Sequence, residues 1–83
     1  MKILIKLGGR IKEYQPDAIG GMLEITTSPD ITLPELFKRL RITEDTDELL
    51  VVVDGENVPP SARAGYNLQE DQLINIMPPL KGG

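Results

Sequence analysis

The sequence predicts an α+β domain: a mixed four- or five-stranded sheet with one main helix packed on one face and an extended C-terminal tail. A length of 83 residues suits one domain with two packed layers. One segment has the 3.6-residue period of a helix, and several short segments have strand patterns bounded by turn residues. We expect the domain to span residues 1–79 and a flexible diglycine tail to span residues 80–83.

The first part of the chain predicts two strands joined by a long connection. Residues 2–7 alternate apolar and charged side chains, as in a half-buried strand. Residues 22–27 are rich in β-forming residues and predict a second strand, antiparallel to the first. The intervening residues 8–21 are mostly polar, with glycine turns at both ends, and their candidate core anchors are Ile11, Tyr14 and Ile19.

The middle of the chain predicts one amphipathic helix over residues 33–41. Thr32 and Glu35 have the spacing of a capping box, and Pro34 falls in the first turn, where its missing amide donor costs little. The apolar residues that follow recur at helical spacing and predict one buried face, made of Leu33, Leu36, Phe37 and Leu40.

The second half predicts the remaining strands. Residues 49–53 are apolar on both parities, as expected of a strand covered on both faces. Asp54-Gly55 predicts a tight turn, after which Val58 pairs back briefly. Residues 61–72 have no periodic pattern, and Leu68 is their expected core anchor.

The last strand is predicted over residues 73–77, and Pro78-Pro79 ends it because neither proline offers an amide donor. The first and last strands are expected to be central, parallel neighbours. Their connection crosses the sheet and contains the helix, which satisfies the right-handed crossover rule.

The composition excludes many kinds of chemistry. Because the chain has no cysteine, histidine or tryptophan, it cannot form disulfides, thiolate nucleophiles, tetrahedral zinc sites or imidazole bases. The net charge is −4, and the densest basic cluster is Lys38-Arg39 with Arg41, so no nucleic-acid partner is expected. The longest apolar run, Leu49 to Val53, is too short to span a bilayer, so we expect a cytoplasmic protein and no membrane partner.

The acidic residues and glycine pairs are better explained by turns than by sites. The run Glu44-Asp45-Thr46-Asp47-Glu48 lacks the glycine and distal glutamate of a calcium loop, which favours a solvated acidic bend. Neither Gly8-Gly9 nor Gly20-Gly21 extends into a phosphate-binding motif. Four other carboxylates each have a turn-forming explanation, so no metal site is expected and an enzyme is the least favoured class: Asp54, Glu56, Glu70 and Asp71.

The C-terminal segment offers one chemical group, the terminal carboxylate. Pro78 and Pro79 form a stiff base, and Gly82 and Gly83 can enter a passage too narrow for side chains. A carboxylate is a poor electrophile, so it needs activation, for example by adenylation, before a sulfur nucleophile can displace AMP. Since the chain has no cysteine, the activating site and the sulfur must both come from partners.

Together, these features resemble a MoaD/ThiS-type sulfur carrier with the ubiquitin-like β-grasp fold. The resemblance rests on the leading strand, the capped helix, Val53-Asp54-Gly55-Glu56 and the ending Met77-Pro78-Pro79-Leu80-Lys81-Gly82-Gly83. It covers essentially the whole chain. In one place the sequence departs from the family, since Glu70-Asp71-Gln72 stands where an acidic-Gly-acidic turn is usual.

The resemblance implies a protein cosubstrate and assigns roles to the tail. Gly83 would be adenylated and converted to a thiocarboxylate. The residues expected to contact partners are Gly82, Lys81, Leu80 and Pro79. The implied partners are an E1-like adenylating enzyme, a sulfur donor and a large acceptor subunit such as that of molybdopterin synthase. No cofactor would be bound by the chain itself, while the adenylating enzyme would use ATP and Mg²⁺.

Three functions remain open from the sequence. The first is sulfur donation in cofactor biosynthesis, with molybdopterin favoured over thiamine because Pro78-Pro79 is closer to the molybdopterin synthase small subunit. The second is a ubiquitin-like modifier joined to lysines of other proteins through Gly83. The third is a β-grasp module that binds a partner without covalent chemistry.

Overall fold

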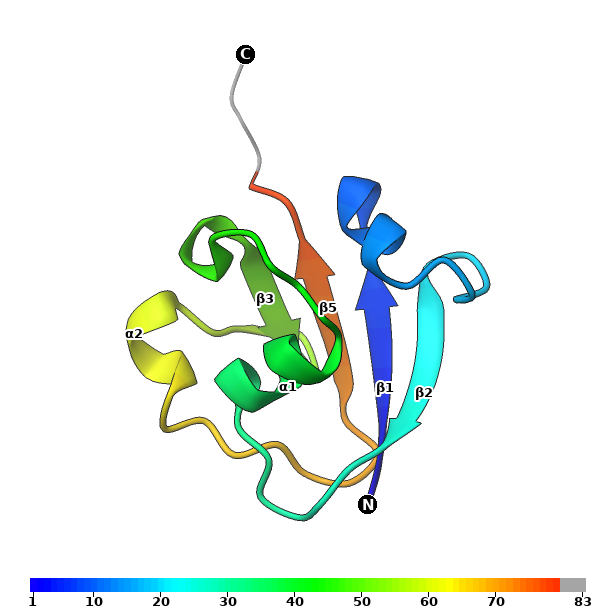
Figure 1. The fold of residues 1–83 in the computed structure, drawn as a ribbon. Helices are drawn as coiled ribbons and strands as arrows, with labels where there is room; N and C mark the ends of the chain where they lie inside the picture. Colours follow the sequence, from blue (N-terminus) through cyan, green and yellow to red (C-terminus); the bar gives the residue numbers. More distant parts are fainter. Residues whose placement is uncertain (80–83) are drawn as a thin grey trace.

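A computed structural model describes residues 1–79 of the chain. These residues form a mixed sheet with α1 packed across one face (Figure 1). In chain order, the elements are β1 (Lys2–Leu7), the 3-10 helix η1 (Gly9–Tyr14), β2 (Met22–Thr26), α1 (Leu33–Arg39), the 3-10 helix η2 (Thr46–Glu48), β3 (Leu50–Val53), β4 (Glu56–Asn57), α2 (Pro60–Arg63) and β5 (Leu73–Met77).

Within residues 1–79 the sheet has five strands in the order β2-β1-β5-β3-β4. β1 and β5 are central and parallel, from the pair Leu4–Leu73 to the pair Leu7–Ile76, and the other neighbouring strands are antiparallel. The predicted α+β class, the position of both central strands and the bounds of β5 are therefore confirmed.

Helix α1 begins as predicted and ends two residues early, at Arg39 rather than residue 41. Thr32 and Glu35 form the capping box, in which Glu35 Oε1 accepts from the Thr32 amide at 3.4 Å and from its hydroxyl at 2.9 Å. The helix stops because Arg41 adopts a left-handed conformation with φ 60°, which turns the chain away from the helix axis.

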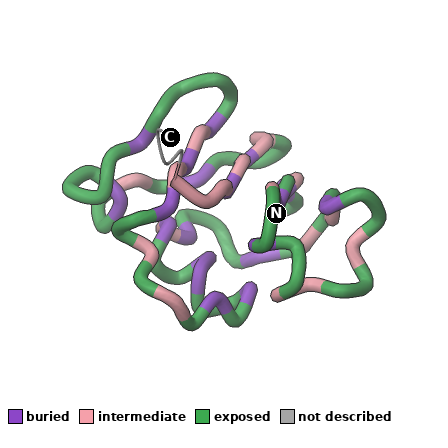
Figure 2. Tube along the Cα trace, turned by 90° about the horizontal axis from the view of Figure 1, so that it is seen from above, coloured by how far each residue is buried: buried purple, intermediate pink, exposed green. Residues whose placement is uncertain are grey.

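The core lies between α1 and the face of the sheet that α1 covers. The predicted apolar face of the helix is buried there, together with side chains from the central strands and Leu68, which was also predicted. Most of the loop residues around this core are exposed, as the green parts of the tube in Figure 2 show. The fully buried residues of the two central strands are Ile3, Ile5, Leu7, Ile74 and Ile76.

The prediction that residues 49–53 are covered on both faces is wrong. In β3, Val51 and Val53 are buried, whereas Leu50 and Val52 are only half-buried. Their side chains lie on the face opposite α1, where Leu50 pairs with Met77 across the strands. No second layer covers that face in the described part of the chain, so the continuous apolar run reflects an open sheet face and not two-sided burial.

Two connections are more ordered than the sequence indicated. The connection over residues 8–21 contains η1, which is anchored by buried Ile11, and α2 forms a helical turn at residues 60–63, overlapping the start of the span expected to lack periodic structure. Ile19 was expected to be a core anchor, but its side chain is 87% exposed at the tip of the glycine turn.

The turn before β5 keeps a left-handed residue without using glycine. Asp71 has φ 65°, and its amide donates to the Lys2 carbonyl oxygen at 2.7 Å. Aspartate tolerates this conformation better than most residues do. Asp71 can therefore adopt the turn conformation for which the resembled family usually has a glycine.

Candidate functional site at the root of the C-terminal tail

The last described residues leave the sheet at the end of its two central strands. Met77 is the final residue of β5, and Pro78 and Pro79 follow it half-buried. Because β1 runs parallel to β5, the turn after β1 lies beside this exit, at the end of the molecule far from the N-terminus (Figure 1). We call Met77, Pro78 and Pro79 the tail root.

Proline chemistry explains why the strand ends here. Near the end of β5, the Gly8 amide donates to the Ile76 carbonyl oxygen at 2.9 Å, and Met77 is the last residue to pair with β3. Pro78 and Pro79 have no amide hydrogen, so they cannot extend the pairing, and both restrict φ to about −65°. The direction in which the chain leaves β5 therefore depends on the backbone of Met77 and on the residues that contact the Pro78 ring.

An apolar hollow of about 270 Å³ lies at the tail root. The backbone of Gly8 and Gly9 forms one side of it, and Leu50 and Met77 form its walls from neighbouring strands. Its lining is Gly8, Gly9, Leu50, Met77 and Pro78. The hollow offers an apolar surface directly beside the point where the tail begins.

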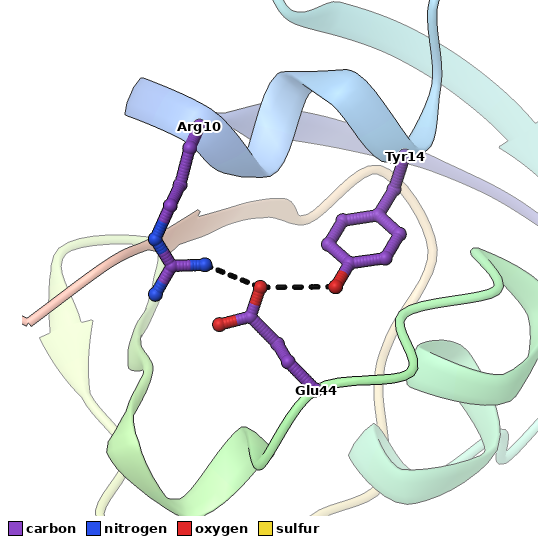
Figure 3. Close-up of polar contacts among 3 residues, drawn as sticks. All are labelled: Arg10, Tyr14 and Glu44. Atoms are coloured by element: carbon purple, nitrogen blue, oxygen red, sulfur yellow. Dashed lines mark hydrogen bonds and ion pairs between the residues drawn. The ribbon is translucent and has the colours of Figure 1, made fainter.

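A polar cluster fastens η1 beside the tail root (Figure 3). One carboxylate oxygen of Glu44 accepts hydrogen bonds from the Arg10 guanidinium and from the Tyr14 hydroxyl, the latter at 3.0 Å. We call these three residues the polar brace. The hydrogen bond from Arg10 lowers the pKa of Glu44, with a further lowering by Tyr14, although partial desolvation opposes both.

Glu44 therefore does not behave as the solvated bend predicted for residues 44–48. Its side chain is partly buried and joins η1 to the segment before η2, 34 residues away in sequence from Arg10. The rest of the run is closer to the prediction, since Asp45 caps η2 by accepting from the Asp47 amide at 3.0 Å. Among residues 1–79, no group of three or more acidic side chains is arranged to hold a metal ion.

The sequence-predicted site residues fall mostly beyond this region. Pro79 is described and half-buried at the tail root. The other predicted residues lie outside the described residues: Leu80, Lys81, Gly82 and Gly83. Of the turn carboxylates, Asp54 has φ 49°, which supports its turn-forming role, and its carboxylate also accepts from the Leu73 amide at 2.9 Å.

Sequence reasoning missed three features that the structure makes important: the close contact at Gly9, the polar brace and the buried Arg63. Gly9 and the polar brace contact partners that are distant in sequence, so no local pattern marks them. Arg63 is only 4% exposed, and its guanidinium donates to the carbonyl oxygens of three segments. A single arginine in an unpatterned segment gives no signal of burial.

No helix within residues 1–79 is long and apolar enough to cross a membrane.

The comparison with protein families decides the relationship. The profile of the ThiS family matches residues 6–83, from the last two residues of β1 through the C-terminal diglycine. The chain belongs to the ThiS family. No curated protein matches the sequence.

Solved structures agree with this ThiS-family assignment at the level of the fold. The crystal structure of SAMP1 from Haloferax volcanii aligns with a TM-score of 0.74 at 18% identity, covering 100% of both chains. The solution structure of the small archaeal modifier protein 1 from Methanosarcina acetivorans aligns with a TM-score of 0.63 at 17% identity, covering 99% of this chain and 96% of that one. The ubiquitin-like β-grasp fold is thereby confirmed.

Proposed function

We propose that this ThiS-family protein is a sulfur carrier whose terminal carboxylate is adenylated and then converted to a thiocarboxylate. The observation that carries the proposal is the family match extending through Gly82 and Gly83. The tail root supports it, because the chain leaves a five-stranded body through two residues that cannot pair with the sheet. In this function the chain is a protein cosubstrate and not an enzyme.

The proposed chemistry proceeds in two displacements. A carboxylate oxygen of Gly83 attacks the α-phosphorus of ATP, and pyrophosphate leaves with the electrons of the broken P–O bond. Hydrosulfide, delivered by a sulfur donor, then attacks the acyl carbon and expels AMP, which leaves a thiocarboxylate. We assign the ATP- and Mg²⁺-binding site to an E1-like adenylating enzyme, the partner that membership of the ThiS family implies.

Each tail residue has a proposed role in this exchange. Gly82 and Lys81 occupy the narrow passage of the partner with Gly83, and Leu80 and Pro79 contact the rim of that passage. The net charge of −4 favours association with basic partner surfaces. The acceptor we propose is the large subunit of a molybdopterin synthase, because of the Pro78-Pro79 resemblance, with the thiamine pathway as the alternative outcome.

Reconstitution tests the pathway directly. The thiocarboxylated protein is mixed with a molybdopterin synthase large subunit and its precursor, or with the thiazole-forming enzyme of thiamine synthesis. The proposal expects sulfur transfer in the first mixture and protein returned as the carboxylate. Transfer only in the second would move the chain to the thiamine pathway, and transfer in neither would contradict a role as sulfur donor.

A second candidate function is a ubiquitin-like modifier. One of the solved structures that share this fold is named a small archaeal modifier protein. An isopeptide bond from Gly83 to a target lysine would use the same adenylate, with a lysine amine replacing hydrosulfide as the nucleophile. Digestion of proteins from the native host would then yield lysines carrying a diglycine remnant, and their absence would exclude this function.

A further inference from the structure

The turn after β1 packs so closely against the tail root that its two glycines leave no room for side chains. An added Cβ at Gly8 would lie 2.9 Å from Met77 Cγ, and one at Gly9 would lie 3.0 Å and 3.3 Å from Pro78 Cγ and Cδ. Gly9 also has φ +53°, where side chains are disfavoured. Two consecutive glycines thus pack against the last two residues before Pro79, and we call them the glycine seat.

Contact with the tail root distinguishes this pair from the other glycines of residues 1–79. An added Cβ at Gly21 would also be crowded, but by the Leu7 carbonyl oxygen at 2.4 Å and not by the tail root. Gly20 has a similar left-handed φ of +60°, yet an added Cβ there would meet no atom within 4 Å. At Gly20 the backbone conformation alone accounts for glycine. At Gly9 the space is needed as well, because the Pro78 ring occupies it.

The glycine seat is held rigidly from its C-terminal side. Arg10 follows Gly9 and is tied to Glu44 in the polar brace, as Figure 3 shows. Ile11 is fully buried, and its amide donates to the Gly8 carbonyl oxygen at 3.1 Å. The Gly8 amide in turn donates to the Ile76 carbonyl oxygen at 2.9 Å. The seat is therefore fixed to both the core and β5 before the tail begins.

We propose that Gly8 and Gly9 are positioning residues, which fix the direction in which the tail leaves β5 and so present the Gly83 carboxylate to the adenylating site. This inference rests on the proposed function. The proline ring cannot rotate away from a contact without moving its own backbone, because the ring includes the backbone nitrogen. Contact with Gly9 therefore constrains the chain itself.

A small shift of Pro78 at the glycine seat can become a larger displacement of the Gly83 carboxylate at the end of the tail. Restoring an ordinary contact distance of at least 3.4 Å from the 3.0 Å contact requires Pro78 to move by about 0.4 Å or more. When the proposed passage of the partner holds the tail fully extended, Gly83 is up to ~20 Å from Met77, so such a shift over the ~3.8 Å between Met77 and Pro78 would displace the tip by about 2 Å. Misplacement of a reacting group by ~1 Å can lower a rate by ~100-fold.

The test compares Gly9→Asn with the matched control Gly20→Asn. Both substitutions place the same side chain at a left-handed glycine, and only the first meets Pro78. Pyrophosphate release is measured with the purified E1-like adenylating enzyme of the same host, ATP and Mg²⁺. We expect Gly9→Asn to lower kcat at least tenfold with little change in KM, and Gly20→Asn to match the wild type.

Rescue separates positioning from damage to the fold. Pro78→Ala removes the ring atoms that the new Cβ would meet, so adding Gly9→Asn in the P78A background should lower kcat less than twofold. Urea midpoints of the single variants report any loss of folding. An equal loss of kcat in both backgrounds, or no loss in the native background, would overturn the positioning role.

A second readout does not depend on activation. Because the chain has no cysteine, Glu70→Cys and Lys81→Cys can carry a pair of spin labels whose separation is measured by pulsed electron resonance. We expect Gly9→Asn to shift the mean separation, and Arg10→Ala, which weakens the brace without adding atoms at the seat, to broaden its distribution. Unchanged separations would refute the seat even if the chain is adenylated. Shifted separations in a chain whose wild type is never adenylated would uphold the seat and refute the proposed function.

Discussion

The side chain of Arg63 provides the most quantitative test of the fold. Its guanidinium donates from Nε to Val58 at 3.0 Å, from Nη1 to Thr46 at 2.6 Å and from Nη2 to Leu49 at 2.7 Å, each to a carbonyl oxygen. One side chain thus joins α2 to the segment after β4, to η2 and to the residue that directly precedes β3. Burial lowers the pKa of Arg63, with a partial opposing contribution from Asp47.

Replacing Arg63 with methionine keeps an unbranched apolar side chain but removes all three donors. A buried carbonyl left without a partner costs about 1–3 kcal/mol, and the contact with Thr46 is only partly buried, so we expect a loss of about 3–5 kcal/mol. Domains of this size are usually stable by roughly 4–12 kcal/mol. A loss of that magnitude would lower Tm by more than about 10 °C.

Urea unfolding followed by far-UV circular dichroism measures this loss for Arg63→Met and for Arg63→Lys. The ammonium group cannot reach three separate carbonyls in one geometry, so Arg63→Lys should recover only part of the stability. Surface arginines contribute little, and Arg39→Met on the exposed side of α1 serves as the control. A loss below about 1 kcal/mol for Arg63→Met would refute the reasoning.

Two further predictions concern single carboxylates. The pKa of Glu44 is lowered in the folded state by the hydrogen bond from Arg10, so its stabilising effect is present above the ordinary carboxyl pKa and is lost as the pH falls through the lowered value. Urea midpoints of the wild type and Glu44→Gln should therefore differ at pH 7 and converge in acid; a difference that grows in acid would contradict this sign. Asp71 has φ 65°, so Asp71→Gly should change the unfolding free energy by less than about 1 kcal/mol while Asp71→Val lowers it by about 1–2 kcal/mol. Equal effects of these two substitutions would contradict a left-handed turn.

Local pattern was sufficient to predict the elements that carry periodic burial. Helix α1 was predicted because its apolar residues recur at the spacing of one buried face, and that face is buried as expected. Strand β5 was predicted as an apolar segment ended by Pro78-Pro79, and its bounds agree. The end of α1 was missed because it depends on the left-handed conformation of Arg41, a residue type with no preference for it. Apolar residues on both parities of β3 did not distinguish an open sheet face from a covered one.

The parts of the site that the sequence did not predict depend on long-range contacts. Glu44 stands in an acidic run that suggests only solvation, and its partner Arg10 is 34 residues away. The glycine pair after β1 predicted a turn correctly, but its contact with Pro78 requires the parallel pairing of β1 and β5. Tertiary neighbours, and not local preference, therefore give these residues their importance.

The central claim concerns the terminal carboxylate, and intact-mass spectrometry tests it most directly. The protein is incubated with the E1-like adenylating enzyme, ATP, Mg²⁺ and sulfide, beside a chain that lacks Gly83. We expect the full chain to gain the mass difference between one sulfur and one oxygen, and the shortened chain to keep its mass. An unchanged full chain, or the same gain in the chain without Gly83, would contradict the claim that this residue carries sulfur.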